Sequence, residues 1–84
     1  MTMTIGIREK PKELSDRELE VVRLIAKGYS SVEVGRLLFI TDRTVQQHVR
    51  NVFNKLGVDS RIEMIIELLW KGKLKIEEVR GELE

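Results

Sequence analysis

Four side chains able to recognise nucleic-acid bases occur within one short stretch of this chain. On a helix, Arg43, Gln46, Gln47 and Arg50 fall within a stripe about 100° wide. Glutamine offers the paired donor and acceptor that match adenine, and arginine the paired donors that match guanine. We therefore expect these four residues to contact base edges in the major groove of DNA, with the amino-terminal half of the helix entering deepest.

A second polar row, Thr44, His48, Asn51 and Lys55, follows one flank of the same stretch. Such groups suit phosphate oxygens, which position a helix on DNA without reading sequence. Ser31, at the amino end of a preceding helix, is expected to offer its free amide to a further phosphate. Other readings stay open: a polar face is commonly only solvated, His48 borders the core face, and Lys55 suits the negative end of the helix dipole.

The helices that position these residues are marked by their caps. The pattern Ser-x-x-Glu, which predicts a reciprocal capping box, begins at Ser15, Ser30 and Ser60, and Thr41 is a further cap. Glycines follow three of the periodic segments and predict their ends. The expected helices run from Ser15 to just before Gly28, from Ser30 to about Leu38, over Asp42–Leu56, and from Ser60 to about Lys71.

The second and third of these helices form a helix-turn-helix, because only Phe39, Ile40 and Thr41 separate them. Gly35 is expected where two helices approach closely. The third helix places a core face opposite its polar stripe: Val45, Val49, Val52 and Leu56. The predicted fold class is all-α, a four-helix bundle containing a helix-turn-helix.

The last predicted helix carries more apolar residues than one face needs. Four of them have core spacing and are expected to seal the helix to the bundle: Ile62, Ile65, Ile66 and Leu69. The remaining apolar residues are expected to be exposed and to form the interface of a homodimer: Met64, Leu68 and Trp70. In domain terms, we expect a flexible arm over residues 1–13, a DNA-binding domain over 14–74, and a charged tail over 75–84 with room for one short helix.

Composition excludes several other classes of protein. The chain has 84 residues, one histidine and no cysteine, so neither a catalytic site, a metal site nor a cofactor site is expected. No apolar run reaches the roughly 20 residues of a membrane span, and we expect a cytoplasmic protein. The net charge is +1, with residues 39–58 weakly basic and residues 59–84 acidic, and Arg61 is expected to pair with Glu18 or Glu20.

Several segments together resemble the LuxR/GerE-type DNA-binding domain, most closely the short stand-alone GerE-like regulators. They are Leu14-Ser-Asp-Arg-Glu-Leu-Glu-Val-Val22, Gly28-Tyr-Ser-Ser-Val-Glu-Val34, Leu38-Phe-Ile-Thr-Asp-Arg-Thr-Val-Gln-Gln-His-Val-Arg50 and Lys55-Leu-Gly-Val-Asp-Ser-Arg61. The resemblance covers about Leu14 to Leu74. It implies a four-helix domain that binds DNA as a dimer through its last helix, with the base and backbone contacts given above.

Three residues depart from the pattern of that family. Val32 and Leu37 stand where charged or polar residues are usual, which puts a phosphate contact near Val32 in doubt, and Gln46 stands where a cation is common. The reading favoured by the sequence is a sequence-specific transcription regulator that occupies a promoter and contacts RNA polymerase. Two alternatives stay open, a helical protein–protein adaptor and a polymerase-associated module resembling the promoter-binding end of a sigma factor.

Overall fold

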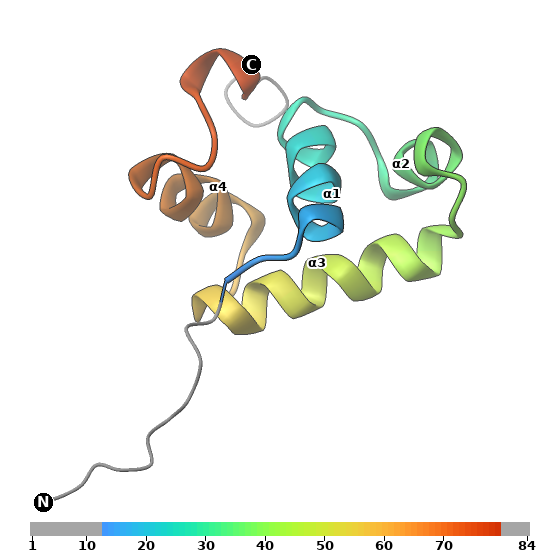
Figure 1. Cartoon of the computed structure of the whole chain (residues 1–84), viewed down its shortest axis with the longest axis horizontal. Helices are drawn as coiled ribbons and strands as arrows, with labels where there is room; N and C mark the ends of the chain where they lie inside the picture. Colours follow the sequence, from blue (N-terminus) through green and yellow to red (C-terminus); the bar gives the residue numbers. More distant parts are fainter. Residues whose placement is uncertain (1–12, 80–84) are drawn as a thin grey trace, which may run out of the picture.

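Four α-helices joined by short turns make up most of the described part of the chain (Figure 1). The structure is a computed structural model that describes residues 13–79; the predicted arm, apart from Glu13, and residues 80–84 lie outside the described residues. The helices are α1 Asp16–Ala26, α2 Ser31–Leu38, α3 Asp42–Leu56 and α4 Arg61–Trp70, followed by a short 3-10 helix, η1, Ile76–Glu78. The prediction of an all-α, four-helix fold is confirmed. None of the helices within residues 13–79 has the length and apolar character needed to cross a membrane.

The helices begin where the sequence predicts because short polar caps satisfy their first amides. The Glu18 amide donates to Ser15 Oγ over 3.1 Å, and Glu18 Oε1 accepts from the Ser15 amide over 2.9 Å. Ser30 and Glu33 form the same reciprocal pair. The expected third box is wrong in one half: Ser60 Oγ accepts from the Glu63 amide, but the Glu63 carboxylate accepts from the amide of Asp59.

The backbone of Ser60 accounts for that difference. Its φ is −139°, whereas Ser15 and Ser30 have φ near −74° and −78°. The more extended conformation turns the Ser60 amide away from the Glu63 carboxylate, and the preceding amide takes its place. The Ser60 side chain still accepts from a first-turn amide, so α4 begins at Arg61, directly after the predicted cap.

The turn between α2 and α3 packs closely against α2 at Gly35. The Ile40 amide donates to the carbonyl oxygen of Gly35 over 2.9 Å. A Cβ on Gly35 would lie 2.5 Å from the carbonyl oxygen of Ile40, so only glycine fits there without a backbone shift. The expected close approach at Gly35 is confirmed, although the turn, rather than another helix, makes it.

The hydrophobic core lies where α1 crosses the middle of α3, with α2 beside the amino-terminal half of α3 and α4 on the other side (Figure 1). Of the predicted core face of α3, Val45 and Val52 are completely buried, while Val49 and Leu56 are partly buried against the same core. The opposite face of α3 is therefore left to solvent.

The predicted orientation of the last helix is wrong in part. Ile65 is buried and Leu69 is partly buried against the core, as expected. Met64 and Leu68, expected at an exposed dimer surface, are completely buried as well. Ile62 and Ile66, expected in the core, are 53% and 59% exposed. Apolar residues on two faces of α4 satisfy the same helical spacing, so the pattern alone did not identify the face that packs. Of the three predicted interface residues, Trp70 alone is exposed, to 86%.

The packed part of the chain extends past the predicted boundary at residue 74. Val79 is buried in the core cluster beside Leu74, and η1 supplies the short helix for which the tail has room. Glu78 also forms an ion pair with Arg23 of α1, with 3.7 Å between Nε and Oε2. The first residues of the tail thus cover one end of α1.

Candidate nucleic-acid interface

The exposed face of α3 carries all four side chains predicted to contact bases. Arg43, Gln46, Gln47 and Arg50 are exposed, because Val45 and Val52 hold the opposite face of the helix in the core. Neither Arg43 nor Arg50 forms an ion pair with any residue between 13 and 79. The face therefore presents two guanidinium groups and two amides, the groups whose hydrogen-bonding patterns match base edges and phosphates.

Hydrogen bonds within α3 order part of this face. Gln47 Nε2 donates to Asn51 Oδ1, one turn further along, over 3.1 Å. At the start of the helix, Thr41 Oγ1 accepts from the Thr44 amide and donates to Thr44 Oγ1. A side chain already held in one rotamer loses less conformational entropy when it binds.

The flanking row predicted to contact phosphates is less uniform than its spacing suggests. Thr44 is exposed, whereas His48 and Asn51 are half-buried. His48 Nδ1 is buried and has no hydrogen-bond partner among the described residues. Only the other ring nitrogen of His48 is then placed to meet a phosphate.

Lys55, the last member of that row, already has a partner inside the protein. Its Nζ donates to Glu18 Oε1 over 2.8 Å and to the carbonyl oxygen of Glu13 over 3.2 Å. The side chain of Lys55 is 33% exposed and that of Glu18 only 7%. This ion pair joins the carboxyl-terminal end of α3 to the start of α1. Lys55 therefore has a role within the fold that the sequence analysis did not predict, and its contact with a phosphate stays a prediction.

The Glu18 carboxylate is stabilised in its charged form. Burial by itself raises the pKa of Glu18, but the hydrogen bonds from Lys55 Nζ and the Ser15 amide outweigh burial and hold the pKa below the usual value for glutamate. Sequence reasoning missed this role. A signal was present, because Glu18 has the helical spacing of the buried Val22 and Ile25.

The predicted pairing of Arg61 is wrong as well. Glu18 pairs with Lys55, and Glu20 pairs with Arg17 one turn away at 3.4 Å. Arg61 forms no ion pair within the described part of the chain and is exposed. Both carboxylates that were expected to pair with Arg61 therefore have other cationic partners.

The amino end of α2 is the further site at which a phosphate contact is predicted. Ser31 and Val32 form its first turn, where backbone amides have no acceptor within the helix. Ser30 Oγ accepts from the Glu33 amide only, so the earlier amides are left for an external acceptor. Within residues 13–79, no cluster of three histidine or acidic side chains that could hold a metal ion occurs.

Comparison with known proteins identifies the sequence pattern of this domain. Residues 12–68 match the family described as GerE, bacterial regulatory proteins, luxR family. The chain is 36% identical over 77 residues to the transcriptional regulatory protein DegU of Brevibacillus brevis, covering 86% of this chain and 33% of DegU. It is 44% identical over 63 residues to the oxygen regulatory protein NreC of Staphylococcus aureus, covering 75% of this chain and 29% of NreC. The chain thus spans about a third of these relatives.

Solved structures agree with the sequence comparison. The structure of the transcription factor GerE superposes with a TM-score of 0.71 at 39% identity, covering 74% of this chain and 92% of that one. The response regulator ChrA of a heme-sensing two-component system superposes with a TM-score of 0.74 at 29% identity, over 81% of this chain and 34% of ChrA.

Proposed function

The chain belongs to the luxR family of bacterial regulatory proteins, and we propose that it regulates transcription by binding specific sequences of double-stranded DNA through α3. The observation that carries the proposal is the exposed polar face of α3, in which Arg43 and Arg50 have no ionic partner among the described residues. A helix of this kind fits the major groove, and the short turn after α2 gives the pair its helix-turn-helix geometry.

The residues of the interface divide into two groups in this proposal. The base contacts are Gln46, Gln47, Arg50 and Arg43. The backbone contacts are Thr44, the exposed nitrogen of His48, Asn51, and the Ser31 amide at the amino end of α2. Lys55 positions α3 against α1 through Glu18, and its side chain, 33% exposed, is a further candidate for contact with a phosphate.

Selection of bound duplexes from a random pool tests specific recognition directly. We expect enrichment of a common half-site, and we expect Arg50→Ala to weaken binding to it by about 1–3 kcal/mol while leaving binding to random duplexes nearly unchanged. Arg17→Ala is the matched control, because it removes an arginine from the surface of α1. If Arg50→Ala weakened binding to every duplex equally, Arg50 would be a positioning residue.

We propose further that two copies bind a two-fold site, with α4 as the contact between them. The exposed apolar residues Ile62, Ile66 and Trp70 recur every four residues and so follow one stripe of α4. A stripe this small suits a weak dimer that forms on DNA. In this proposal the protein acts in the cytoplasm at promoters, in contact with RNA polymerase.

A further inference from the structure

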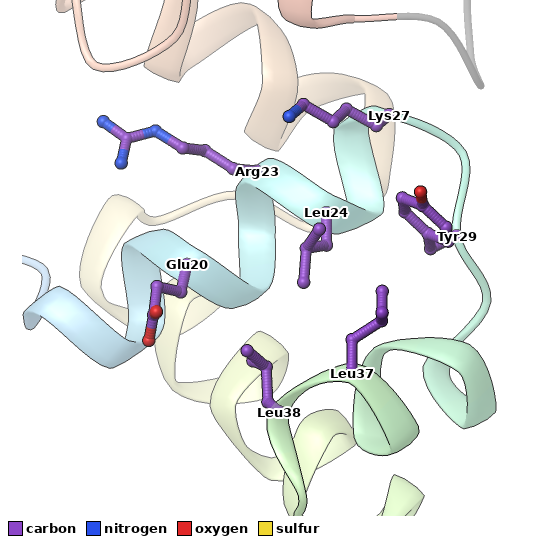
Figure 2. Close-up of a pocket in the computed structure, with 7 residues that line it drawn as sticks. All are labelled: Glu20, Arg23, Leu24, Lys27, Tyr29, Leu37 and Leu38. Carbon is purple, nitrogen blue, oxygen red and sulfur yellow. The ribbon is translucent and has the colours of Figure 1, made fainter.

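A groove of about 390 Å³ lies between α1 and α2 (Figure 2). Its apolar lining comes from Leu24 of α1, Tyr29 of the connecting turn, and Leu37 and Leu38 of α2. Figure 2 shows Leu24 and Leu37 pointing toward each other across the groove, with Tyr29 at one end. No residue of α3 lines it. The groove is thus separate from the proposed DNA-contacting face.

The groove leaves apolar side chains partly exposed to water. Leu37 is 49% exposed and Tyr29 is 40% exposed. Single exposed apolar residues are normal on a protein surface, whereas several that line one concave site mark a place where another molecule binds. Water is displaced from these side chains when an apolar partner enters, which favours association.

The charged residues around the groove specify the sign of that partner. Glu20 is already paired with Arg17 at 3.4 Å. Arg23 is paired with Glu78 at 3.7 Å, and Lys27 forms no ion pair with any residue in the described range. Lys27 therefore leaves one positive charge at the edge of the groove that no carboxylate of the described residues balances. Carboxylates on a partner are attracted to this edge, and ammonium groups are repelled.

We propose that the groove between α1 and α2 docks an acidic amphipathic helix of a partner protein. Such a helix places apolar side chains on Leu24, Leu37 and Tyr29 and carboxylates near Lys27 and Arg23, a common mode of peptide recognition. The inference goes beyond the proposed function and does not require it, because the groove uses no residue of the DNA-contacting face.

Two other occupants fit the groove less well. It is open along one side, so a small molecule would keep much of its surface in water, whereas binding sites for small molecules enclose most of their ligand. A second copy of this chain, docked groove to groove about a two-fold axis, would bring the same excess positive charge to the edge and no carboxylate left over to balance Lys27. Like charges oppose that pairing.

A labelled helical peptide tests the proposal on the full chain. The probe has about 12 residues, with leucine at i, i+3, i+4 and i+7 and glutamate on both flanks, and a second peptide replaces each glutamate by lysine. We expect the acidic peptide to bind about tenfold more tightly than the basic one and to shift the amide resonances of Leu24, Tyr29 and Leu37. The same preference is expected for protein bound to a selected duplex.

Variants locate the binding site. Leu37→Asn is expected to weaken binding of the acidic peptide about tenfold, and Lys27→Glu to remove the preference for the acidic peptide, with thermal unfolding and duplex affinity unchanged. Ile76→Asn is the control, because Ile76 is apolar, 60% exposed and outside the groove. Equal binding of the two peptides, or binding unaffected by both groove variants, would overturn the proposal. Loss of duplex binding by wild-type protein would count against the proposed function alone.

Discussion

At the scale of single residues, the ion pair between Glu18 and Lys55 links the interface to the core. The two residues lie 37 positions apart, and their contact fixes the end of α3 against α1. Removing Lys55 leaves a carboxylate buried with fewer partners, which is more costly than losing an exposed pair. We expect Lys55→Met to lower the free energy of unfolding by about 1–3 kcal/mol, measured by chemical denaturation.

Two further variants show whether the loss comes from the pair itself. In the double variant Glu18→Gln with Lys55→Met, the loss should be smaller than the sum of the two single losses, because the stranded charge is gone. Lys71→Met is the matched control: Lys71 pairs with Glu67 at 3.4 Å, but both side chains are exposed, and its removal should cost less than about 0.5 kcal/mol. Additive losses in the double variant would show that the two residues act independently.

The same carboxylate predicts how stability depends on pH. Since the pKa of Glu18 is lower in the folded protein than in the unfolded chain, its contribution is complete above the unfolded pKa of about 4.3 and is lost as the pH falls through the folded pKa. We expect the difference in melting temperature between wild type and Glu18→Gln to shrink as the pH is lowered from about 6 to 3. A difference that stays constant across this range would contradict the assignment.

At the scale of elements, the junction of α2 with its turn depends on a missing side chain. Gly35→Ala would place a methyl group 2.5 Å from the carbonyl oxygen of Ile40. Alanine favours a helix by up to about 1 kcal/mol over glycine, but the clash is with backbone and cannot be relieved by a rotamer change. We expect a net destabilisation of about 1–3 kcal/mol in thermal unfolding, and a displaced turn.

Arg36→Ala is the comparison for this variant. Arg36 is the next residue of α2 and is exposed, so alanine there tests helix propensity without the clash. Its unfolding free energy should stay within about 0.5 kcal/mol of wild type. A Gly35→Ala protein as stable as Arg36→Ala would mean that the turn has room to move away from α2.

At the scale of the whole molecule, the exposed stripe of α4 predicts cooperative binding to a two-fold site. Ile66→Glu places a charge at the middle of the stripe, on a residue that is largely exposed in the single chain. We expect the variant to fold normally by circular dichroism, to bind a half-site like wild type, and to lose cooperative binding to the whole site in gel shifts.

Two comparisons make that result specific. Ile76→Glu, on an equally exposed isoleucine outside α4, should leave cooperativity intact. Leu68→Glu, by contrast, should unfold the chain, because Leu68 is completely buried and a charge there has no partner. Undiminished binding of two Ile66→Glu copies to the whole site would exclude α4 as the contact between them.

Local interactions explain why the sequence alone determined most of the fold and the face of α3. A serine or threonine cap and the amide it satisfies lie three residues apart, so the starts of all four α-helices could be predicted without knowledge of packing. In α3 the apolar residues occupy one side only, and burial of Val45 and Val52 leaves a single orientation for Gln46 and Arg50. The exposed face of α3 that forms the candidate interface could therefore be predicted from the sequence.

Tertiary structure decided two things that the spacing of residues along the sequence could not show: which face of α4 packs, and which residues of different helices meet. In α4, apolar residues occupy two faces, and only packing into the common core selected Met64 and Leu68 over Ile62 and Ile66. The partner of Lys55 and the groove between α1 and α2 join residues from different helices. Helical periodicity describes one helix at a time, so contacts of this kind appear only once the helices are placed together.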